Sequence, residues 1–132
     1  MAKSPQARTI AALEAEGYLV DITERRITSK IKKDLFGFID VVALAPAGSV
    51  TWGGRVHETR KGGLLGVQIT SGSNHAARRK KILNECRDAA IWWLNCRNRI
   101  QVRSWSKRVV RRGQPKRVWV ERVEDITLEM FG

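Results

Sequence analysis

Long apolar runs are missing from this chain of 132 residues. No uncharged apolar stretch approaches the roughly 18 to 20 residues that a membrane span needs, so we expect no membrane partner. The first six residues, MAKSPQ, also lack the apolar core of a secretory signal. Cysteine is scarce, because Cys86 and Cys96 are too few for a disulfide framework. These absences and the chain length predict a single globular domain over residues 1–132, located in the reducing cytoplasm.

The sequence signatures of several enzyme classes are missing as well. The chain has no G-x-x-x-x-G-K-[ST], G-x-G-x-x-G or G-x-S-x-G pattern, so nothing supports P-loop nucleotide hydrolysis or serine-hydrolase chemistry. The two cysteines, His57 and His75 lack the paired short spacing of a structural zinc site. We therefore interpret the cysteines as apolar helix residues, and we expect neither histidine to be a nucleophile.

Acidic residues are nearly absent from residues 78–117, which contain fourteen Lys or Arg side chains but only Glu85 and Asp88. This stretch accounts for the whole net charge of +12, because the other 92 residues contain eleven basic and eleven acidic groups. Such an excess is typical of a surface that binds phosphates, so we expect a nucleic-acid partner, DNA in the first place with RNA left open. The candidate contacts are Arg78, Arg79, Lys80, Lys81, Arg108, Arg111, Arg112 and Lys116. A solvated basic face and an acidic protein partner are the alternatives.

Turn and capping residues divide the chain into regular elements. Ser4-Pro5 and Gly17 delimit a helix over about residues 5–16, and residues 23–33 are predicted to be a basic loop. The expected strands cover residues 18–22, 38–44, 64–70, 100–105 and 118–123, the last two forming a hairpin that turns at residues 111–115. A second helix is expected from about residue 74 to 96, with its core face at Ile82, Cys86, Ala89, Trp93 and Cys96.

One carboxylate stands out in this pattern. Asp40 interrupts the apolar strand 38–44, where an unpartnered charge costs several kcal/mol. In the next strand, the two-residue period places Gln68 and Thr70 on the face opposite Leu65, Val67 and Ile69. Because side chains on neighbouring strands can converge, the sequence predicts a polar site that contains Asp40 and Gln68.

The stretches DLFGFID at residues 34–40 and GVQITSGSN at residues 66–74, followed by a basic helix, resemble the PD-(D/E)XK nuclease superfamily. This superfamily includes Holliday-junction resolvases and restriction endonucleases, and the resemblance is greatest to small phage-encoded members. It covers about residues 5–105. It implies an α/β fold with a restriction-endonuclease-like αβββαβ core, a mixed central sheet flanked by helices and an added C-terminal β-hairpin.

The same resemblance implies a DNA endonuclease that hydrolyses phosphodiester bonds with Mg²⁺ or Mn²⁺. In the family, an Asp on the second core strand and an acidic residue two positions before a Lys on the third strand bind the ion and activate a water. Carried over to this chain, Asp40, Gln68 and Thr70 are the catalytic residues, and Asp40 and Gln68 are the metal ligands. Gln6 lies near the place of a helix Glu in the resolvases, and Glu14 is a second helix candidate. Resolvases also suggest a homodimer, and a phage-type member suggests the host-cell cytoplasm.

This chain departs from the family pattern at three positions. Gln68 stands where the family has Asp or Glu, Thr70 where it has Lys, and Gln6 where resolvases have Glu. The substitutes that the sequence offers are Glu14 or Glu16 for the helix carboxylate, and Lys30, Lys32 or Lys33 for the strand lysine. An inactive nucleic-acid-binding module on the same fold, with Asp40 held by backbone amides or an arginine, is the alternative to a nuclease.

Aromatic residues allow two interpretations. Trp93 fits the apolar stripe of the second helix and is expected in the core. Trp105 and Trp119 lie on strands among basic residues, where they can stack on bases or pack against each other across the hairpin, the arrangement we favour.

Overall fold

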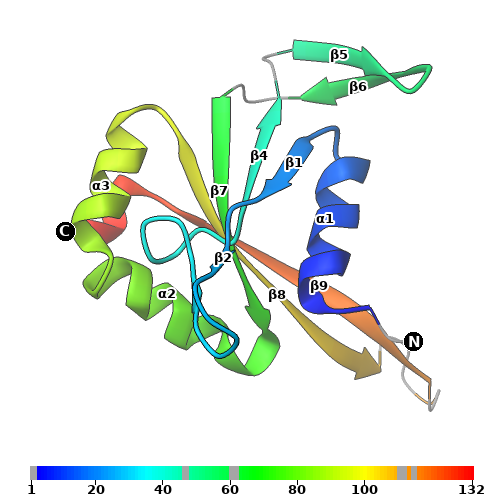
Figure 1. Ribbon diagram of the computed structural model, residues 1–132. Helices are drawn as coiled ribbons and strands as arrows, with labels where there is room; N and C mark the ends of the chain where they lie inside the picture. Colours follow the sequence, from blue (N-terminus) through cyan, green and yellow to red (C-terminus); the bar gives the residue numbers. More distant parts are fainter. Residues whose placement is uncertain (1–2, 46–47, 60–62, 110–112, 114–115) are drawn as a thin grey trace.

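A computed structural model of the chain describes residues 3–45, 48–59, 63–109, 113 and 116–132. A five-stranded sheet runs through the molecule with its strands in the order β1-β4-β7-β8-β9 (Figure 1). These strands are β1 (Leu19–Ile22), β4 (Val41–Ala45), β7 (Gly63–Ser71), β8 (Arg99–Val109) and β9 (Arg117–Ile126). β7 and β8 pair in parallel and the other three neighbouring pairs are antiparallel, so the sheet is mixed.

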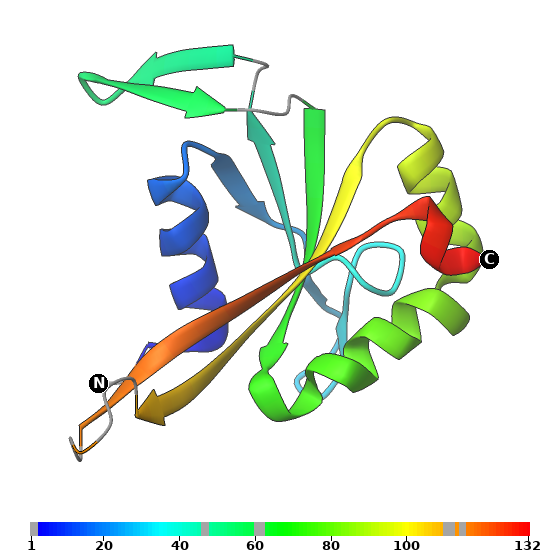
Figure 2. The ribbon, with the colours of Figure 1, turned by 180° about the vertical axis from the view of Figure 1, so that it is seen from behind.

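Helices cover both faces of this sheet. α1 (Pro5–Ala15) lies on one face, and α2 (His75–Asn84) and α3 (Arg87–Asn95) lie on the other (Figures 1 and 2). The predicted α/β class, with a mixed sheet flanked by helices, is therefore confirmed. None of the described helices is both long and apolar enough to cross a membrane.

The predicted signals at the ends of the first helix are confirmed. The Ser4 hydroxyl accepts a hydrogen bond from the Ala7 amide at 3.1 Å, and Pro5 occupies the first helical position. Gly17, just past the end, has a φ of 100°, the left-handed conformation that ends helices.

The apolar side chains form one cluster on each face of the sheet. On the α1 face, Leu13 packs with alternate residues of two strands, namely Val41, Ala43, Leu65 and Val67. On the α2 and α3 face, the buried residues are Phe38, Ile39, Ile82, Ala90, Ile100, Val102, Ile126 and Phe131, and Cys86, Ala89 and Trp93 pack against them. The predicted core face of the second helical region is confirmed, apart from Cys96, which is exposed. Alternation along β7 places Gln68 and Thr70 on the face opposite Leu65, Val67 and Ile69, as predicted, and this is the face that α2 covers.

The prediction of one continuous second helix is wrong. α2 ends at Asn84 and α3 begins at Arg87, because Cys86 has φ −103° and ψ 18° and its amide bonds to the Lys81 carbonyl five residues back. This wide turn redirects the chain so that the apolar residues of both helices still face the sheet. The sequence gives no signal for this break, because it contains no proline or helix-ending glycine there and the apolar residues keep their helical spacing across Cys86.

Two short hairpins lie outside the five sheet strands. β2 (Arg25–Arg26) pairs with β3 (Lys32–Lys33) inside the expected basic loop, and β5 (Gly48–Trp52) pairs with β6 (Arg55–Thr59) before β7. The β5–β6 hairpin stands off one end of the sheet (Figure 2). Two single 3₁₀ turns, η1 (Gly72–Asn74) and η2 (Leu128–Phe131), complete the described elements. β8 and β9 form the expected C-terminal hairpin, whose predicted turn lies outside the described residues except for Gly113.

Buried polar contacts join α2 to the strands beneath it. The His75 side chain is 1% exposed and lies between Ser104 and Glu124, with Nδ1 2.6 Å from the Ser104 hydroxyl and Nε2 2.9 Å from a Glu124 carboxylate oxygen. These two hydrogen bonds fix the start of α2 against β8 and β9. His75 is therefore a buried residue that connects α2 to both strands of the C-terminal hairpin.

Candidate active site

Asp40 and Gln68 lie side by side, as the sequence predicts. The Gln68 side-chain amide donates to Asp40 Oδ2 at 2.7 Å, and the Ile69 backbone amide donates to the same oxygen at 2.7 Å. The backbone sets up this contact, since the Asp40 amide donates to the Val67 carbonyl at 2.9 Å, directly before the β4–β7 pairing begins. Asp40 is 6% exposed and Gln68 is 2% exposed. Asp40 itself directly precedes β4, which starts later than the predicted strand.

A tight turn brings a second carboxylate, Asp34, to Asp40. Leu35 and Ile39 form an antiparallel bridge, and the Phe38 amide donates to the Leu35 carbonyl at 3.2 Å. Phe36 and Gly37, between them, have φ values of 54° and 83°, the positive values that a type I′ hairpin turn requires. The chain thus folds back on itself within six residues, which places Asp34 next to Asp40.

Glu24 completes a cluster of three carboxylates. The Asp40 carbonyl accepts hydrogen bonds from the Thr23 amide at 2.9 Å and from the Glu24 amide at 3.2 Å, which fixes this segment beside the start of β4. One carboxylate oxygen from each of Glu24, Asp34 and Asp40 lies within 4.8 Å of the others. Lys32 offsets part of the negative charge, with its Nζ 3.6 Å from a Glu24 oxygen.

The environment of Asp40 strongly disfavours its charged form. Burial is the largest of the causes that raise the pKa of Asp40 to about 8. Hydrogen bonding to Asp34 and the charges of Asp34 and Glu24 also raise this pKa, whereas the hydrogen bond from the Ile69 amide lowers it. Without a cation, the site therefore favours the protonated form of this carboxyl. A cation that entered the cluster would favour the ionised form.

One polar atom beside the cluster has no partner among the described residues. Gln68 Oε1 is buried and accepts no hydrogen bond from them, although the same side chain donates to Asp40 through its amide nitrogen. An unsatisfied buried acceptor costs about 1 to 3 kcal/mol, so its position calls for an explanation. An amide oxygen is also a hard ligand of the kind that Mg²⁺ binds.

The cluster opens into a cavity of about 730 Å³ at the end of the sheet where β7 meets α2. Gln68 and Thr70 line it, and Gln6 reaches it from the start of α1. The cations in its wall come from the β2–β3 hairpin and from α2, namely Lys32, Lys33, Arg78 and Lys81. A cavity lined by both carboxylates and cations can hold a phosphodiester, with the carboxylates available to a metal ion.

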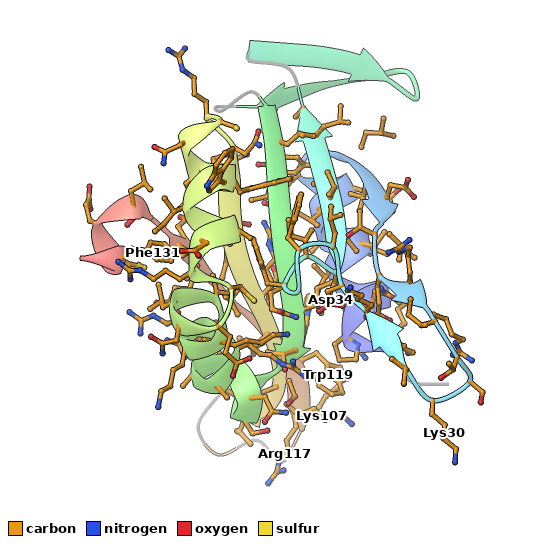
Figure 3. The ribbon with its side chains drawn as sticks, turned by 60° about the vertical axis from the view of Figure 1, so that its left-hand side comes forward. Lys30, Asp34, Lys107, Arg117, Trp119 and Phe131 are labelled. Carbon is orange, nitrogen blue, oxygen red and sulfur yellow. The ribbon has the colours of Figure 1, made fainter. Side chains whose placement is uncertain are left out.

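Several residues proposed for this site lie elsewhere. Glu16 is bound on the α1 face by the buried Arg103, whose guanidinium nitrogens lie 2.7 and 3.1 Å from its carboxylate oxygens, so it does not replace the helix carboxylate. Glu14 is exposed on α1 and does not line the cavity. Lys30 lies at the outer end of the β2–β3 hairpin, directed away from the cavity (Figure 3). Lys32 and Lys33 are the two proposed lysines that line it.

The basic residues predicted to bind nucleic acid are divided by the fold. Arg78 and Lys81 line the cavity, and Lys80 is exposed on the same helix. Arg79 instead lies in an ion pair, with its Nε 3.0 Å from Glu124. Arg108 and Lys116 are exposed near the tip of the C-terminal hairpin, and Arg111 and Arg112 lie outside the described residues.

The expected pairing of the two strand tryptophans is wrong. Trp119 lies opposite Lys107 in the strand register, and Trp105 lies opposite Glu121. The Trp119 ring is contacted by cations, with the Arg8 guanidinium 4.4 Å and Lys107 Nζ 5.3 Å from its centre, and Figure 3 shows Lys107 next to Trp119. The Trp105 ring nitrogen donates to the Thr9 hydroxyl at 2.8 Å. Helix α1 thus provides the partners that the strand pattern did not reveal.

Sequence reasoning identified Asp40, Gln68 and Thr70 but assigned no role to Asp34 or Glu24. The signal for Asp34 is its place in DLFGFID, where Gly37 allows a reversal that returns the chain to Asp40. Glu24 carries no comparable signal, because backbone hydrogen bonds to Asp40 place it. Comparisons with protein families, with curated proteins and with solved structures find no match to this chain.

Proposed function

We propose that this protein is a metal-dependent endonuclease that hydrolyses phosphodiester bonds of DNA at the cavity formed by β7, α2 and the 34–40 turn. The observation that carries the proposal is the carboxylate cluster of Glu24, Asp34 and Asp40 beside the unpartnered Gln68 Oε1. Four cations in the same cavity wall supply the complementary charge for a polyanionic substrate.

Element order supports the restriction-endonuclease-like part of the proposal. Along the chain, a helix is followed by three sheet strands, a helical region and a further sheet strand. This order corresponds to the αβββαβ core that the resemblance implies. Asp40 lies at the start of the second sheet strand, and Gln68 lies on the third strand. These are the positions at which that family has its acidic residues. Asp34 and Glu24 supply carboxylates that position 68 lacks.

The residues of the cluster suit a hard divalent cation. Asp40, Asp34 and Glu24 with Gln68 Oε1 would hold Mg²⁺ or Mn²⁺, which prefer carboxylate and amide oxygens. The ion would supply a water of lowered pKa and stabilise the charge that develops on the phosphate. Two observations support this fit: the pKa of Asp40 is raised, and the buried Gln68 Oε1 has no hydrogen-bond partner among the described residues. A bound cation would stabilise both the ionised carboxylate and the amide oxygen.

The chain's own cations would position the substrate. Arg78 and Lys81 lie on α2, which borders the cavity on one side, and Lys32 and Lys33 lie on the hairpin that borders it on another. A phosphodiester held between them lies next to Asp40. Lys33 is the residue we assign to the role of the missing strand lysine, because Lys32 already neutralises Glu24.

An inactive DNA- or RNA-binding module on the same fold is the second candidate. It is favoured by the two hydrogen bonds that Asp40 Oδ2 accepts from Gln68 and Ile69, which satisfy this oxygen without an ion. The backbone amide is one of the partners that the sequence predicted for this alternative. A homodimer stays a prediction in either case.

The test is cleavage of labelled duplex, branched and single-stranded DNA and of RNA, each with Mg²⁺ and with Mn²⁺. We expect metal-dependent cleavage, faster with Mn²⁺, which tolerates poorer ligand sets and binds such sites more tightly. Asp40→Asn should lower the rate at least about 100-fold, since it removes a charged ligand worth several kcal/mol in the transition state. Its DNA affinity should stay within about twofold.

Asp21→Asn is the matched control, because Asp21 is an exposed carboxylate on the edge strand β1. It should cleave at the wild-type rate. Unchanged cleavage in Asp40→Asn would mean that the active site lies elsewhere. A wild-type protein that binds DNA but cleaves no substrate with either metal would establish the binding module instead.

A further inference from the structure

The β2–β3 hairpin concentrates positive charge outside the basic stretch at residues 78–117. Residues 25–33 contain five cations and no acidic residue, and every residue of the segment is exposed. The cations are Arg25, Arg26, Lys30, Lys32 and Lys33. The hairpin is therefore the second strongly basic feature of the described surface.

The strand register makes this charge unfavourable in the free protein. Arg25 lies directly opposite Lys33, and Arg26 lies directly opposite Lys32. Like charges in opposed positions destabilise a strand pair, and a hairpin of two strands is marginally stable by itself. The ion pair of Lys32 with Glu24 relieves one of these four cations. A polyanion bound along the hairpin would relieve the others.

Two exposed aliphatic side chains lie just beyond the paired cations. Ile27 and Ile31 are 55% and 56% exposed, and the Ile27 amide donates to the Ile31 carbonyl at 2.9 Å, which closes the loop between them. The Thr28 hydroxyl accepts from the Lys30 amide at 3.2 Å and from the Ile31 amide at 3.0 Å. The tip is therefore a hydrogen-bonded turn with an apolar pair at its base and Lys30 at its outer end (Figure 3).

The hairpin begins and ends at the candidate active site. Glu24 and Asp34, the residues at its two ends, belong to the carboxylate cluster, and Lys32 and Lys33 line the cavity. A nucleic acid that occupies the cavity therefore meets the hairpin. The segment 25–33 has no aromatic side chain on which single-stranded bases could stack.

We propose that the β2–β3 hairpin is an arm that binds duplex DNA in the minor groove, with Ile27 and Ile31 inserted as a wedge at a base step. Apolar wedges flanked by Lys and Arg unstack such steps and bend the duplex toward the major groove. The cations of the hairpin hold the phosphates on both sides of the groove. This inference rests on the proposed function in that the ligand is DNA, but it requires no catalysis.

The test uses the Asp40→Asn protein without divalent metal, so that binding is measured separately from cleavage. The probes are a duplex labelled at both ends for energy transfer, its single strand, and anionic phospholipid vesicles. Ile27→Ala with Ile31→Ala should weaken duplex binding at least about tenfold and abolish the bend, with single-strand affinity within about twofold. Arg25→Gln with Arg26→Gln should lower the slope of log affinity against log salt by about two units.

The matched control is Leu19→Ala with Ile22→Ala, which removes two exposed aliphatic side chains from the edge strand β1. It should leave affinity and bending unchanged. Unaltered duplex binding and bending in the Ile27 and Ile31 variant overturns the proposal, as does a loss confined to vesicles, which would make the hairpin a membrane-binding element. If the wild-type protein never cleaves but bends duplex DNA through Ile27 and Ile31, the nuclease proposal is wrong and the proposal for the hairpin stands.

Discussion

At the scale of single residues, Asp40 makes the stability of the metal-free protein depend on pH. Its pKa is raised to about 8 in the folded protein, against about 3.9 for an unfolded Asp. The folded state thus keeps a proton that the unfolded state releases. This contribution to stability is fully present below about pH 4 and is lost as the pH rises to about 8.

Thermal unfolding in a metal chelator should therefore show a midpoint that falls between about pH 5 and pH 8. Asp40→Asn should flatten this dependence, because an amide does not titrate, whereas Asp21→Asn should keep it. A wild-type midpoint that rises over this range, or an equal slope in Asp40→Asn, would show that Asp40 is ionised in the free protein.

Gln68 offers a second prediction at this scale. Gln68→Glu replaces the amide that donates to Asp40 Oδ2 at 2.7 Å with another carboxylate. Without metal, Asp40 Oδ2 loses its amide donor and a fourth acidic group is buried at the cluster, which should lower the unfolding midpoint by several degrees. Mn²⁺ should raise the midpoint by more than in the wild type, since a charged ligand is added. Differential scanning fluorimetry measures both midpoints.

Gln101→Glu is the matched control, because Gln101 is also a buried glutamine that donates to an aspartate, Asp125, at 2.9 Å. Gln101 does not line the candidate site. A carboxylate at position 101 would have the buried Arg103 as a partner, because Arg103 Nε already donates to Gln101 Oε1 at 3.0 Å. Mn²⁺ should therefore raise the unfolding midpoint of Gln101→Glu by no more than that of the wild type. Equal Mn²⁺ stabilisation of both variants would argue against a metal site at Gln68.

At the scale of elements, the turn at residues 34–39 decides whether the carboxylates meet. Gly37 has a φ of 83°, and a Cβ added there would lie 3.2 Å from Cys86 Sγ. Gly37→Ala should destabilise the protein by about 1 to 2 kcal/mol, the cost of a left-handed non-glycine residue. Displacement of Asp34 should also lower cleavage and weaken Mn²⁺ binding severalfold.

Gly54→Ala separates strain from displacement. Gly54 has a φ of 73° in the β5–β6 turn, and an added Cβ would meet nothing within 4 Å. Gly54→Ala should destabilise the protein no more than Gly37→Ala does, and it should leave cleavage and Mn²⁺ affinity unchanged. Equal loss of activity in the two variants would mean that the 34–39 turn does not position the site.

The sequence predicted those elements whose pattern is periodic. Alternation and turn residues identified the sheet strands and placed Asp40 next to Gln68, since that contact follows from adjacent strands. The break at Cys86 and the β2–β3 hairpin have no periodic signature, because backbone hydrogen bonds and tertiary packing determine them. Asp34 and Glu24 were missed for the same reason, as non-helical, non-strand backbone brings them to Asp40.

At the scale of the whole molecule, the basic residues differ in what they can offer a polyanion. Arg78, Lys80 and Lys81 have no ion pair among the interactions that the structure describes for α2, whereas Arg79 is bound to Glu124. Replacing the first three with Gln should lower the slope of log affinity against log salt by about three units, because each phosphate that a side chain neutralises adds about 0.9 to that slope.

Arg79→Gln is the control from the same helix and should change that slope little. Fluorescence anisotropy between about 50 and 200 mM salt measures it. Equal effects of all four substitutions would show that the ion pair opens in the complex. Absence of DNA binding by the wild type at about 50 mM salt would contradict the nucleic-acid assignment.

The central claim is that the carboxylates of Glu24, Asp34 and Asp40 and the amide oxygen of Gln68 hold the ion that supports cleavage. Anomalous diffraction from crystals of the protein grown with Mn²⁺ and a DNA duplex tests it most directly. We predict a Mn²⁺ peak bounded by Asp40, Asp34 and Gln68 Oε1, with a phosphate beside it. A well-ordered site with no peak at these residues, or a peak at other ligands next to the phosphate, would contradict the claim.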